Sequence, residues 1–342
     1  MPGAQVFGAS AFAFAATSYL AAIGCGGGGG TGGTGATGGT GATGGGSGST
    51  TELCAIDKRV GGFAVKLVEA VGTPPITAID GGVRNGVLPS DVWQQKGTAA
   101  GSCKLMVGPM LVCTTPCVSP QICAGQNQCI DSPTYQNAGA VTITGVGTSP
   151  LTLNPLNPNQ MIFAYSTSVG DPYPPFTPGE AVKLQSAGAT IPAFSLEAAG
   201  IEPLAFAGTN LTMRNGEALA FTWTAASAAS SSRILVEIEI GHHGGVAAKL
   251  TCDLPDNGSG QIPASLVSAL IAEGVHGFPT ITLTRRTAAS TNISVGCVDL
   301  AVAAVVQRNL SVCPTATTCV VSCTDNTECS APMVCKEDFT CG

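Results

Sequence analysis

The sequence predicts a mainly β fold. We expect an antiparallel β-sandwich of the immunoglobulin-like class, two small disulfide-rich modules and a disordered, Gly-rich N-terminal tether. Charged residues make up only 10% of the chain, so few residues can form the solvated face of an amphipathic helix. Residues 139–312 contain short alternating runs between Gly, Pro and Asn turns, as β-strands do. The chain also has 15 cysteines, which is typical of a disulfide framework.

Nine segments in residues 139–312 carry β-branched or aromatic residues between turn signals. These predicted strands are residues 140–146, 161–167, 180–186, 191–197, 218–224, 232–240, 246–252, 280–286 and 295–306. A short helix is predicted from Pro263 to Ala272, because Pro favours a first helical turn and Gly274 ends the run. We therefore assign residues 139–312 to the sandwich and expect Trp223 in its core.

Residues 51–135 are less regular, and we assign them to an N-terminal segment that includes the first cysteine-rich module. Within it, residues 62–70 (GFAVKLVEA, starting at Gly62) are compatible with a strand or a short helix. We expect this stretch to pack at the sandwich edge, held by a bond from Cys54 into the first module.

The N-terminus has the features of an export signal. Residues 6–23 are apolar and uncharged, but the run is too weak for a convincing membrane-spanning helix. It ends in Ala22-Ile23-Gly24-Cys25, which resembles the lipobox of bacterial lipoproteins. That resemblance implies a signal peptide over residues 1–24 and a lipid on Cys25. The alternative is an ordinary cleaved signal followed by an unpaired cysteine.

A Gly- and Thr-rich stretch follows the lipobox. Residues 25–50 bury almost no apolar surface, so we expect a disordered linker. Such a coil spans roughly 25–30 Å, a useful spacer between a membrane and a folded domain. Gly26, in place of Asp, resembles the sorting pattern of outer-membrane lipoproteins. We therefore expect an outer-membrane lipoprotein of the cell envelope, outside the cytoplasm, with the lipid as the membrane attachment.

The other cysteines fall into three even groups. They are Cys54, Cys103, Cys113, Cys117, Cys123 and Cys129; Cys252 and Cys297; and Cys313, Cys319, Cys323, Cys329, Cys335 and Cys341. The middle pair has one internal solution, so we predict a Cys252–Cys297 bond. Within each group of six the connectivity stays open.

The outer groups contain an internal repeat. Residues 113–129 and 319–341 share cysteine gaps of three, five and five residues, which indicates two copies of one knot-like module. The second copy defines a C-terminal module over residues 313–342. Zinc binding is the alternative, but neither segment contains His.

No catalytic set is recognisable in the sequence. The chain has three histidines and neither a G-x-S-x-G nor an H-E-x-x-H motif. The best cluster lies on the predicted strand 232–240, where Arg233, Glu237, Glu239 and His243 share the face opposite the apolar residues. Two carboxylates and an imidazole can ligate a metal or shuttle a proton. The alternative is a solvated sheet face on which Arg233 offsets the acids.

A second candidate site is the turn that contains Asp253, Asp256 and Asn257. Acidic and amide oxygens around a glycine turn can bind Ca²⁺, although the EF-hand pattern is not followed. The alternative is a turn capped by Asp side chains. Apart from this possible calcium ion, we expect no cofactor.

The Pro-rich segment 171–180 supplies a candidate contact surface. Its prolines oppose regular strand pairing, so Tyr173 and Phe176 can project from a stiff loop. The alternative is that both aromatic rings plug the end of the sandwich.

Together, the lipobox, the tether, the four-cysteine runs and residues 241–286 resemble uncharacterised cysteine-rich surface lipoproteins of myxobacteria. The resemblance implies an envelope location and no particular activity. The net charge of -7 argues against nucleic acid as a partner. We expect a non-enzymatic, lipid-anchored surface protein whose sandwich binds a glycan or protein or serves a structural role. The alternatives are a secreted hydrolase that uses the Glu/His face and a calcium-dependent carbohydrate-binding module.

Overall fold

A computed structural model describes residues 53–69, 74–147, 150–170, 172–206, 211–227, 231–241, 247–315 and 317–342. The described residues form mainly β-strands, as the sequence predicts. The predicted signal peptide, Cys25, the tether and His243 lie outside the described residues.

One 11-stranded sheet organises the fold. Its strands are β1 (Arg59–Val68), β2 (Ile76–Arg84), β3 (Gln94–Ala100), β4 (Cys103–Val107), β7 (Tyr135–Gln136), β10 (Tyr165–Val169), β13 (Leu211–Arg214), β15 (Arg233–Glu239), β16 (Ala248–Pro255), β18 (Thr280–Ile293) and β19 (Gly296–Cys313). The order across the sheet is β10-β2-β1-β19-β18-β15-β16-β4-β3, with β13 added on β19 and β7 on β2.

The remaining elements form smaller units. A four-stranded sheet has the order β12-β11-β8-β9, and it consists of β8 (Val141–Thr144), β9 (Leu151–Leu153), β11 (Ala181–Ser186) and β12 (Phe194–Ala199). Two-stranded sheets pair β14 (Leu219–Thr222) with β17 (Ser259–Ile262), and β5 (Gln121–Cys123) with β6 (Cys129–Asp131). The helices are α1 (Ala264–Ile271) and the short 3₁₀ turns η1 (Pro89–Asp91), η2 (Pro158–Gln160) and η3 (Asn326–Glu328).

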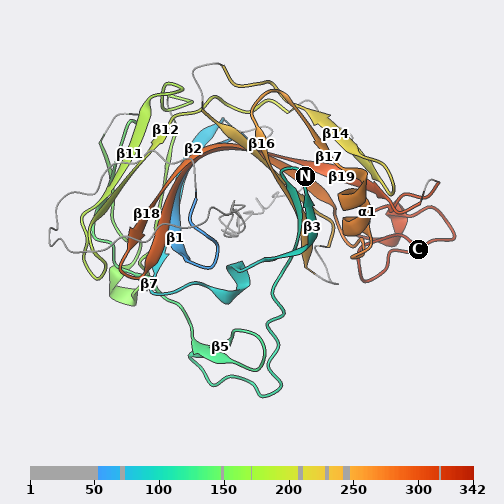
Figure 1. Cartoon of the computed structure of the whole chain (residues 1–342), viewed down its shortest axis with the longest axis horizontal. Helices are drawn as coiled ribbons and strands as arrows, with labels where there is room; N and C mark the ends of the chain where they lie inside the picture. The colour runs from blue at the N-terminus through green and yellow to red at the C-terminus, as the bar shows by residue number, and fades with distance from the viewer. Residues whose placement is uncertain are drawn as a thin grey trace, which may run out of the picture.

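The large sheet bends into an arch, and most of the other elements cover its outer side (Figure 1). The four-stranded sheet covers one arm of the arch through β12, which contacts β18 and β19. Helix α1 contacts β4 and β16 on the other arm. Between the two sheets, the ring of Phe63 on β1 lies 5.6 Å from that of Tyr165 and 6.3 Å from that of Phe194. The core therefore lies between two packed β layers.

The predicted elements can be compared with the observed ones. Each of the nine predicted segments overlaps a strand, and the predicted helix is α1. The large sheet differs from the prediction in being mixed, because β1 and β13 both run parallel to β19. Trp223 is buried in the core, as expected.

The prediction that residues 62–70 pack at an edge is wrong. Strand β1 lies between β19 and β2 near the centre of the sheet. Phe63, Val65 and Leu67 point into the core, while Gly62 and Ala64 occupy the opposite face. Neighbours on both sides satisfy the backbone of this apolar strand, which an edge position cannot do.

The large sheet continues across the predicted boundary between residues 51–135 and 139–312. Strands β1 to β4 belong to the same sheet as β18 and β19, so they are not a separate unit. The segment from Gly108 to Thr134 leaves the sheet. Its ends are fixed by hydrogen bonds from the Gly108 N–H to the Ala247 carbonyl (2.6 Å) and from the Asn85 N–H to the Thr134 carbonyl (3.1 Å). This segment is hereafter the first module.

Seven disulfides join the described cysteines. The pairs are Cys54–Cys297, Cys103–Cys252, Cys113–Cys123, Cys117–Cys129, Cys313–Cys319, Cys323–Cys335 and Cys329–Cys341.

The predicted Cys252–Cys297 bond is therefore wrong. The register of β16 on β4 places Cys252 directly opposite Cys103. Cys297 begins the ladder beside β1, where its N–H donates to the carbonyl of Lys58, close to Cys54 in the chain. Strand pairing, and not the grouping of cysteines along the chain, decides both bonds.

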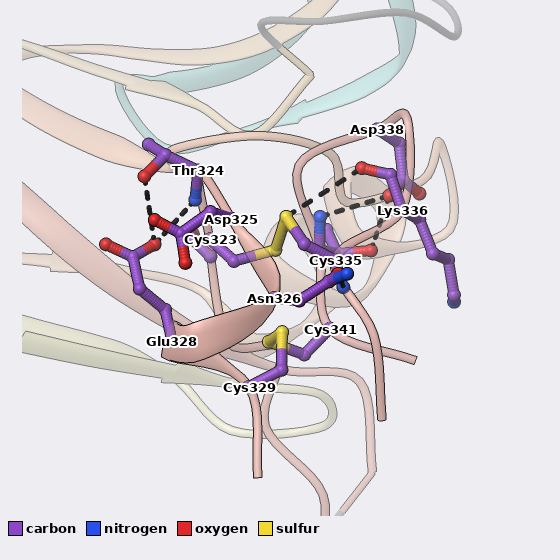
Figure 2. The surroundings of a disulfide bond; sticks show 12 residues. Cys323, Thr324, Asp325, Asn326, Glu328, Cys329, Cys335, Lys336, Asp338 and Cys341 are labelled. Carbon is purple, nitrogen blue, oxygen red and sulfur yellow. Dashed lines mark hydrogen bonds between the residues drawn. A yellow bond between two sulfur atoms is a disulfide. The ribbon is translucent and has the colours of Figure 1, made fainter. Parts of the chain in front are cut away.

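The C-terminal cysteines close among themselves, as predicted for residues 313–342. Figure 2 shows the bonds Cys323–Cys335 and Cys329–Cys341 around η3. Asn326 Oδ1 accepts a hydrogen bond from the Cys335 N–H at 2.8 Å, which fixes the second half of the module onto the first. With their sulfurs bonded in pairs, these cysteines are not the thiolates that zinc requires.

The two modules share only part of their connectivity. In the aligned repeat, Cys117–Cys129 corresponds to Cys323–Cys335. The additional Cys341 takes Cys329 as its partner, and Cys319 instead bonds Cys313 at the end of β19. This last bond attaches the C-terminal module to the large sheet.

We predict that the stabilising effect of the disulfides increases with the length of the loop each one closes. The Cys54–Cys297 bond closes a loop of 243 residues. Replacing both cysteines by Ser should therefore lower the free energy of unfolding, measured by urea denaturation, by about 5 kcal/mol. The matched control replaces Cys313 and Cys319, which are only six residues apart, and should have a smaller effect. Equal losses in the two variants would contradict the assigned pairing.

Candidate functional site

The face of the large sheet opposite the core is the candidate functional site, and β15 runs through it. Ile234, Val236 and Ile238 are fully buried in the core. Arg233, Glu237 and Glu239 alternate with them and therefore occupy the other face. The predicted sharing of one face by these three residues is confirmed. This surface is hereafter the inner face, because it lies on the concave side of the arch (Figure 1).

Cross-strand registers extend the inner face beyond β15. Glu237 lies directly between Thr282 on β18 and Thr251 on β16, and Thr251 in turn faces Lys104 on β4. In the next row, Glu239 lies between Thr280 and Lys249. Residues directly opposite each other in antiparallel strands point to the same side. The centre of the inner face is therefore a pattern of hydroxyl and charged groups.

Lys249 and Glu237 form the most buried ion pair of this pattern. Lys249 Nζ lies 2.8 Å from Glu237 Oε1, and the two side chains are 4% and 12% exposed. The same ammonium group lies 4.5 Å from the ring centroid of Trp93, within cation–π range. Trp93 directly precedes the outermost strand, β3. The pair therefore depends on side chains from β15, from β16 and from the residue before β3.

Burial raises the pKa of Glu237, and the charge of Lys249 opposes this rise only in part. Glu239, two residues along, adds a further repulsive contribution, and Arg286 an attractive one. The charge of Glu237 thus depends on its partner cation. A carboxylate bound in this way is poorly placed to serve as a solvent-exposed general base.

A second ion-paired group lies on the same face. Asp253 Oδ1 lies 2.7 Å from Nε of Arg233, and its Oδ2 lies 3.1 Å from a terminal nitrogen of Arg286. Arg233 also donates to the backbone carbonyl of Asp253 at 2.9 Å. One carboxylate therefore joins β15, β16 and β18 across the sheet.

Asp256 belongs to the opposite side of the sheet. Its carboxylate accepts hydrogen bonds from Arg285 Nε (2.6 Å), Ser232 Oγ (2.6 Å) and Trp223 Nε1 (2.7 Å). Burial by itself would raise the pKa of Asp256, but the hydrogen bonds from these three residues outweigh it and hold the pKa below its ordinary value. Arg285 also donates to the carbonyl of Pro203 at 2.7 Å. This cluster fastens the outer loops to β18.

The predicted calcium donors do not converge. Asp253 binds Arg286 and Asp256 binds Arg285, and these neighbouring arginines on β18 point to opposite faces. Asn257 Oδ1 instead accepts from the N–H of Ser259, two residues later. We therefore replace the predicted calcium turn by two separate carboxylate–arginine clusters.

Of the metal site predicted from Glu237, Glu239 and His243, the structure bears out one feature: the two glutamates lie on the same face of β15. Glu237 binds Lys249, and His243 is outside the described residues. The groups of metal-ligating side chains that come together within the described ranges consist of disulfide cysteines, one of them with Asp299.

The predicted contact surface at Tyr173 and Phe176 is wrong. Phe176 is 8% exposed and belongs to the core. A side chain at Gly200 would come within 2.9 Å of the Phe176 ring, which shows how closely the backbone covers it. The Tyr173 hydroxyl lies 3.2 Å from Glu69 Oε1, and burial together with that carboxylate raises its pKa. Both aromatic rings close the end of the sandwich.

Sequence reasoning did not identify Lys249, Trp93 and Arg286 as members of the inner face. They come from separate segments that only the sheet register brings together. The alternation in residues 246–252 places Lys249 on the other face of the strand from Leu250 and Cys252. This alternation is the one local signal that Lys249 belongs to the inner face.

No protein-family model, no curated protein and no solved structure matches this chain.

We predict that Lys249→Met destabilises the fold in a pH-dependent way. Without the ammonium, Glu237 keeps its burial cost, so the loss at pH 7 should be about 3 kcal/mol. A buried carboxyl whose folded-state pKa is raised contributes stability below its unfolded pKa and loses it as pH rises through the folded value. The deficit should therefore shrink at pH 4, as measured by urea denaturation at both pH values.

Lys183→Met is the matched control for this experiment. Lys183 pairs with Glu197 at 3.1 Å, but the two side chains are 54% and 37% exposed. Its loss should stay below about 1 kcal/mol at either pH. A Lys249→Met deficit that is as small, or that does not change between pH 4 and pH 7, would contradict a dominant burial cost at Glu237.

Proposed function

We propose that this chain is a lipid-anchored protein of the cell envelope, located outside the cytoplasm, whose β-sandwich offers the inner face for non-catalytic binding. The observation that carries the proposal is the complete pairing of the 14 described cysteines in seven disulfides. Such a framework is typical of oxidising compartments. It also leaves no described cysteine to pair with Cys25, whose surroundings resemble a lipobox.

The place where the chain enters the fold suits an anchored protein. Cys54 is bonded to Cys297 at the start of the central strand β19. A pull on residues N-terminal to Cys54 would therefore pass through a covalent bond into the middle of the sheet. None of the helices in the described part of the chain is long and apolar enough to cross a membrane.

The chemistry of the inner face favours a polar ligand. Threonine hydroxyls from β16 and β18 alternate with charged groups from β15, β16 and β4. Hydroxyls, carboxylates and cations in fixed rows offer both donors and acceptors, which suits a glycan or a polar peptide. We propose this class of ligand, with the membrane as the second partner through the lipid.

The alternative functions have less support. A hydrolase would need Glu237 or Glu239 available as an acid or base, whereas Glu237 is bound to Lys249 and shielded from solvent. A calcium-dependent module would need converging oxygen ligands, whereas Asp253 and Asp256 bind arginines on opposite faces.

The anchoring proposal predicts the mass of the mature N-terminus. In cells that make this protein, the mature chain should begin at Cys25 and carry diacylglycerol on its sulfur, as seen by mass spectrometry of the N-terminal peptide. Globomycin, which blocks the lipoprotein signal peptidase, should cause the form that retains residues 1–24 to accumulate. Cys25→Ser should move the protein out of the membrane fraction. A mature chain that begins elsewhere, or that has no lipid on Cys25, would refute anchoring.

A further inference from the structure

The loop between β9 and β10 exposes three large apolar side chains. Leu156, Met161 and Ile162 are 58%, 76% and 43% exposed. The loop is nevertheless well tied: the Leu156 N–H donates to the Ala164 carbonyl at 2.9 Å, and the Asn157 N–H donates to the Ile162 carbonyl at 3.2 Å. These side chains are thus held in water by a structured loop.

This apolar loop lies at the end of the large sheet where the chain from the N-terminus enters. Tyr165, which follows the loop, pairs with Gly81 near the end of β2. The end of β2 pairs with the start of β1, and Arg59 at that start pairs with Cys297. Residues 53–58, which lead in from the predicted tether, are therefore at the same end of the sheet.

The first module adds a second apolar region, and it runs from the far end of the sheet, at Gly108, to the tether end, at Thr134. Met110, Val112 and Val118 are 82%, 66% and 78% exposed. The module returns to the sheet at Thr134, beside Asn85 at the end of β2. Figure 1 shows the module, labelled by β5, extending from the body on the side where β7 lies. Its two disulfides give this extension a fixed shape.

The β9–β10 loop contains no charged residue, and the first module contains one, Asp131. Neither residues 108–130 nor residues 150–170 contain Asp, Glu, Lys or Arg. Moving these segments toward lipid would bury apolar side chains without removing an ionised group from water. The net charge of -7 adds no attraction to anionic lipid. The two apolar regions therefore suit a membrane of zwitterionic lipids, which has no net charge.

We propose that the β9–β10 loop and the first module together form a lipid-contacting edge, which rests on the zwitterionic bilayer surface that holds the anchor. This inference rests on the proposed anchoring. The chain between Cys25 and residue 53 is a Gly-rich segment of 27 residues, and such a coil spans roughly 25–30 Å. The sheet end where it enters therefore stays within reach of the membrane.

The C-terminal module provides an internal comparison. It also exposes apolar residues, among them Met333 at 40% and Val334 at 51%. However, it is attached through Cys313 at the far end of β19 from Cys297. Sixteen steps along a strand at about 3.3 Å each place these ends roughly 50 Å apart. If the tether end faces the membrane, the C-terminal module points away from it.

Fluorescence quenching by brominated phosphatidylcholine tests the proposal. A chain that begins at residue 26 keeps every described strand, and an N-terminal hexahistidine tag with nickel-chelating lipid replaces the natural anchor. Tryptophan is introduced as Leu156→Trp, Met110→Trp or Met333→Trp, and the signal of the unmodified chain, with Trp93 and Trp223, is subtracted. The bromine atoms should quench the added tryptophans at 156 and 110 by half or more and leave the one at 333 unquenched.

A charge substitution supplies the second measurement. Leu156→Asp and Met110→Asp should each weaken binding of the untagged chain to phosphatidylcholine vesicles about tenfold, since each removes an aliphatic contact. Met333→Asp should leave binding unchanged. All three positions are exposed, so unchanged thermal unfolding would show that the variants still fold.

The outcomes separate this proposal from the anchoring proposal. Nickel-chelating lipid holds the chain whether or not Cys25 is lipidated in cells, so failure of lipidation does not alter the quenching result. Unquenched tryptophans at 156 and 110 would overturn the lipid-contacting edge and would favour a protein partner for these side chains. Equal quenching at all three positions would overturn it too, because the chain would then lie on the bilayer without a preferred edge.

Discussion

The disulfide between Cys54 and Cys297 is the constraint on which the rest of the fold depends. It joins the first described residues to the start of β19, the longest strand. Beneath it, Asp299 Oδ1 accepts from the Cys54 N–H at 2.8 Å, and Asp299 Oδ2 lies 2.6 Å from Nε of Arg59. Burial raises the pKa of Asp299, while Arg59 opposes the rise. A covalent bond and a buried ion pair thus hold β1 against β19. Strand β2 pairs with β1, and β10 pairs with β2.

The same principle explains why the two faces of the sheet differ. Apolar side chains fill the core side, whereas the inner face carries buried polar groups, such as Lys249 and Arg286, which need partners within the protein. Lys249 pairs with Glu237, and Asp253 pairs with Arg233 and Arg286, in each case between strands. The pairs stabilise the register, and they leave a rigid pattern of charges and hydroxyls, to which we propose that a polar ligand binds.

The local pattern of the sequence was sufficient for the elements and insufficient for their assembly. Alternation in residues 232–240 correctly separated Ile238 from Glu237, because side-chain direction in a strand depends only on neighbours in the chain. The partner of Cys252 could not be read in this way, since it is set by the pairing of β16 with β4 across 149 residues. The ion pair between Lys249 and Glu237 depends in the same way on strand pairing, here of β15 with β16. The prolines around Phe176 indicate a projecting loop. Its ring is buried instead, because Gly200, which has no side chain, lets a neighbouring segment close over it.

A peptide map of the native protein, alkylated without prior reduction, tests the central claim most directly. The account predicts that no cysteine between Cys54 and Cys341 takes the label, and that digestion yields peptides linked through Cys54–Cys297 and Cys103–Cys252. Labelled thiols at these four positions, or a peptide that links Cys252 to Cys297, would contradict it.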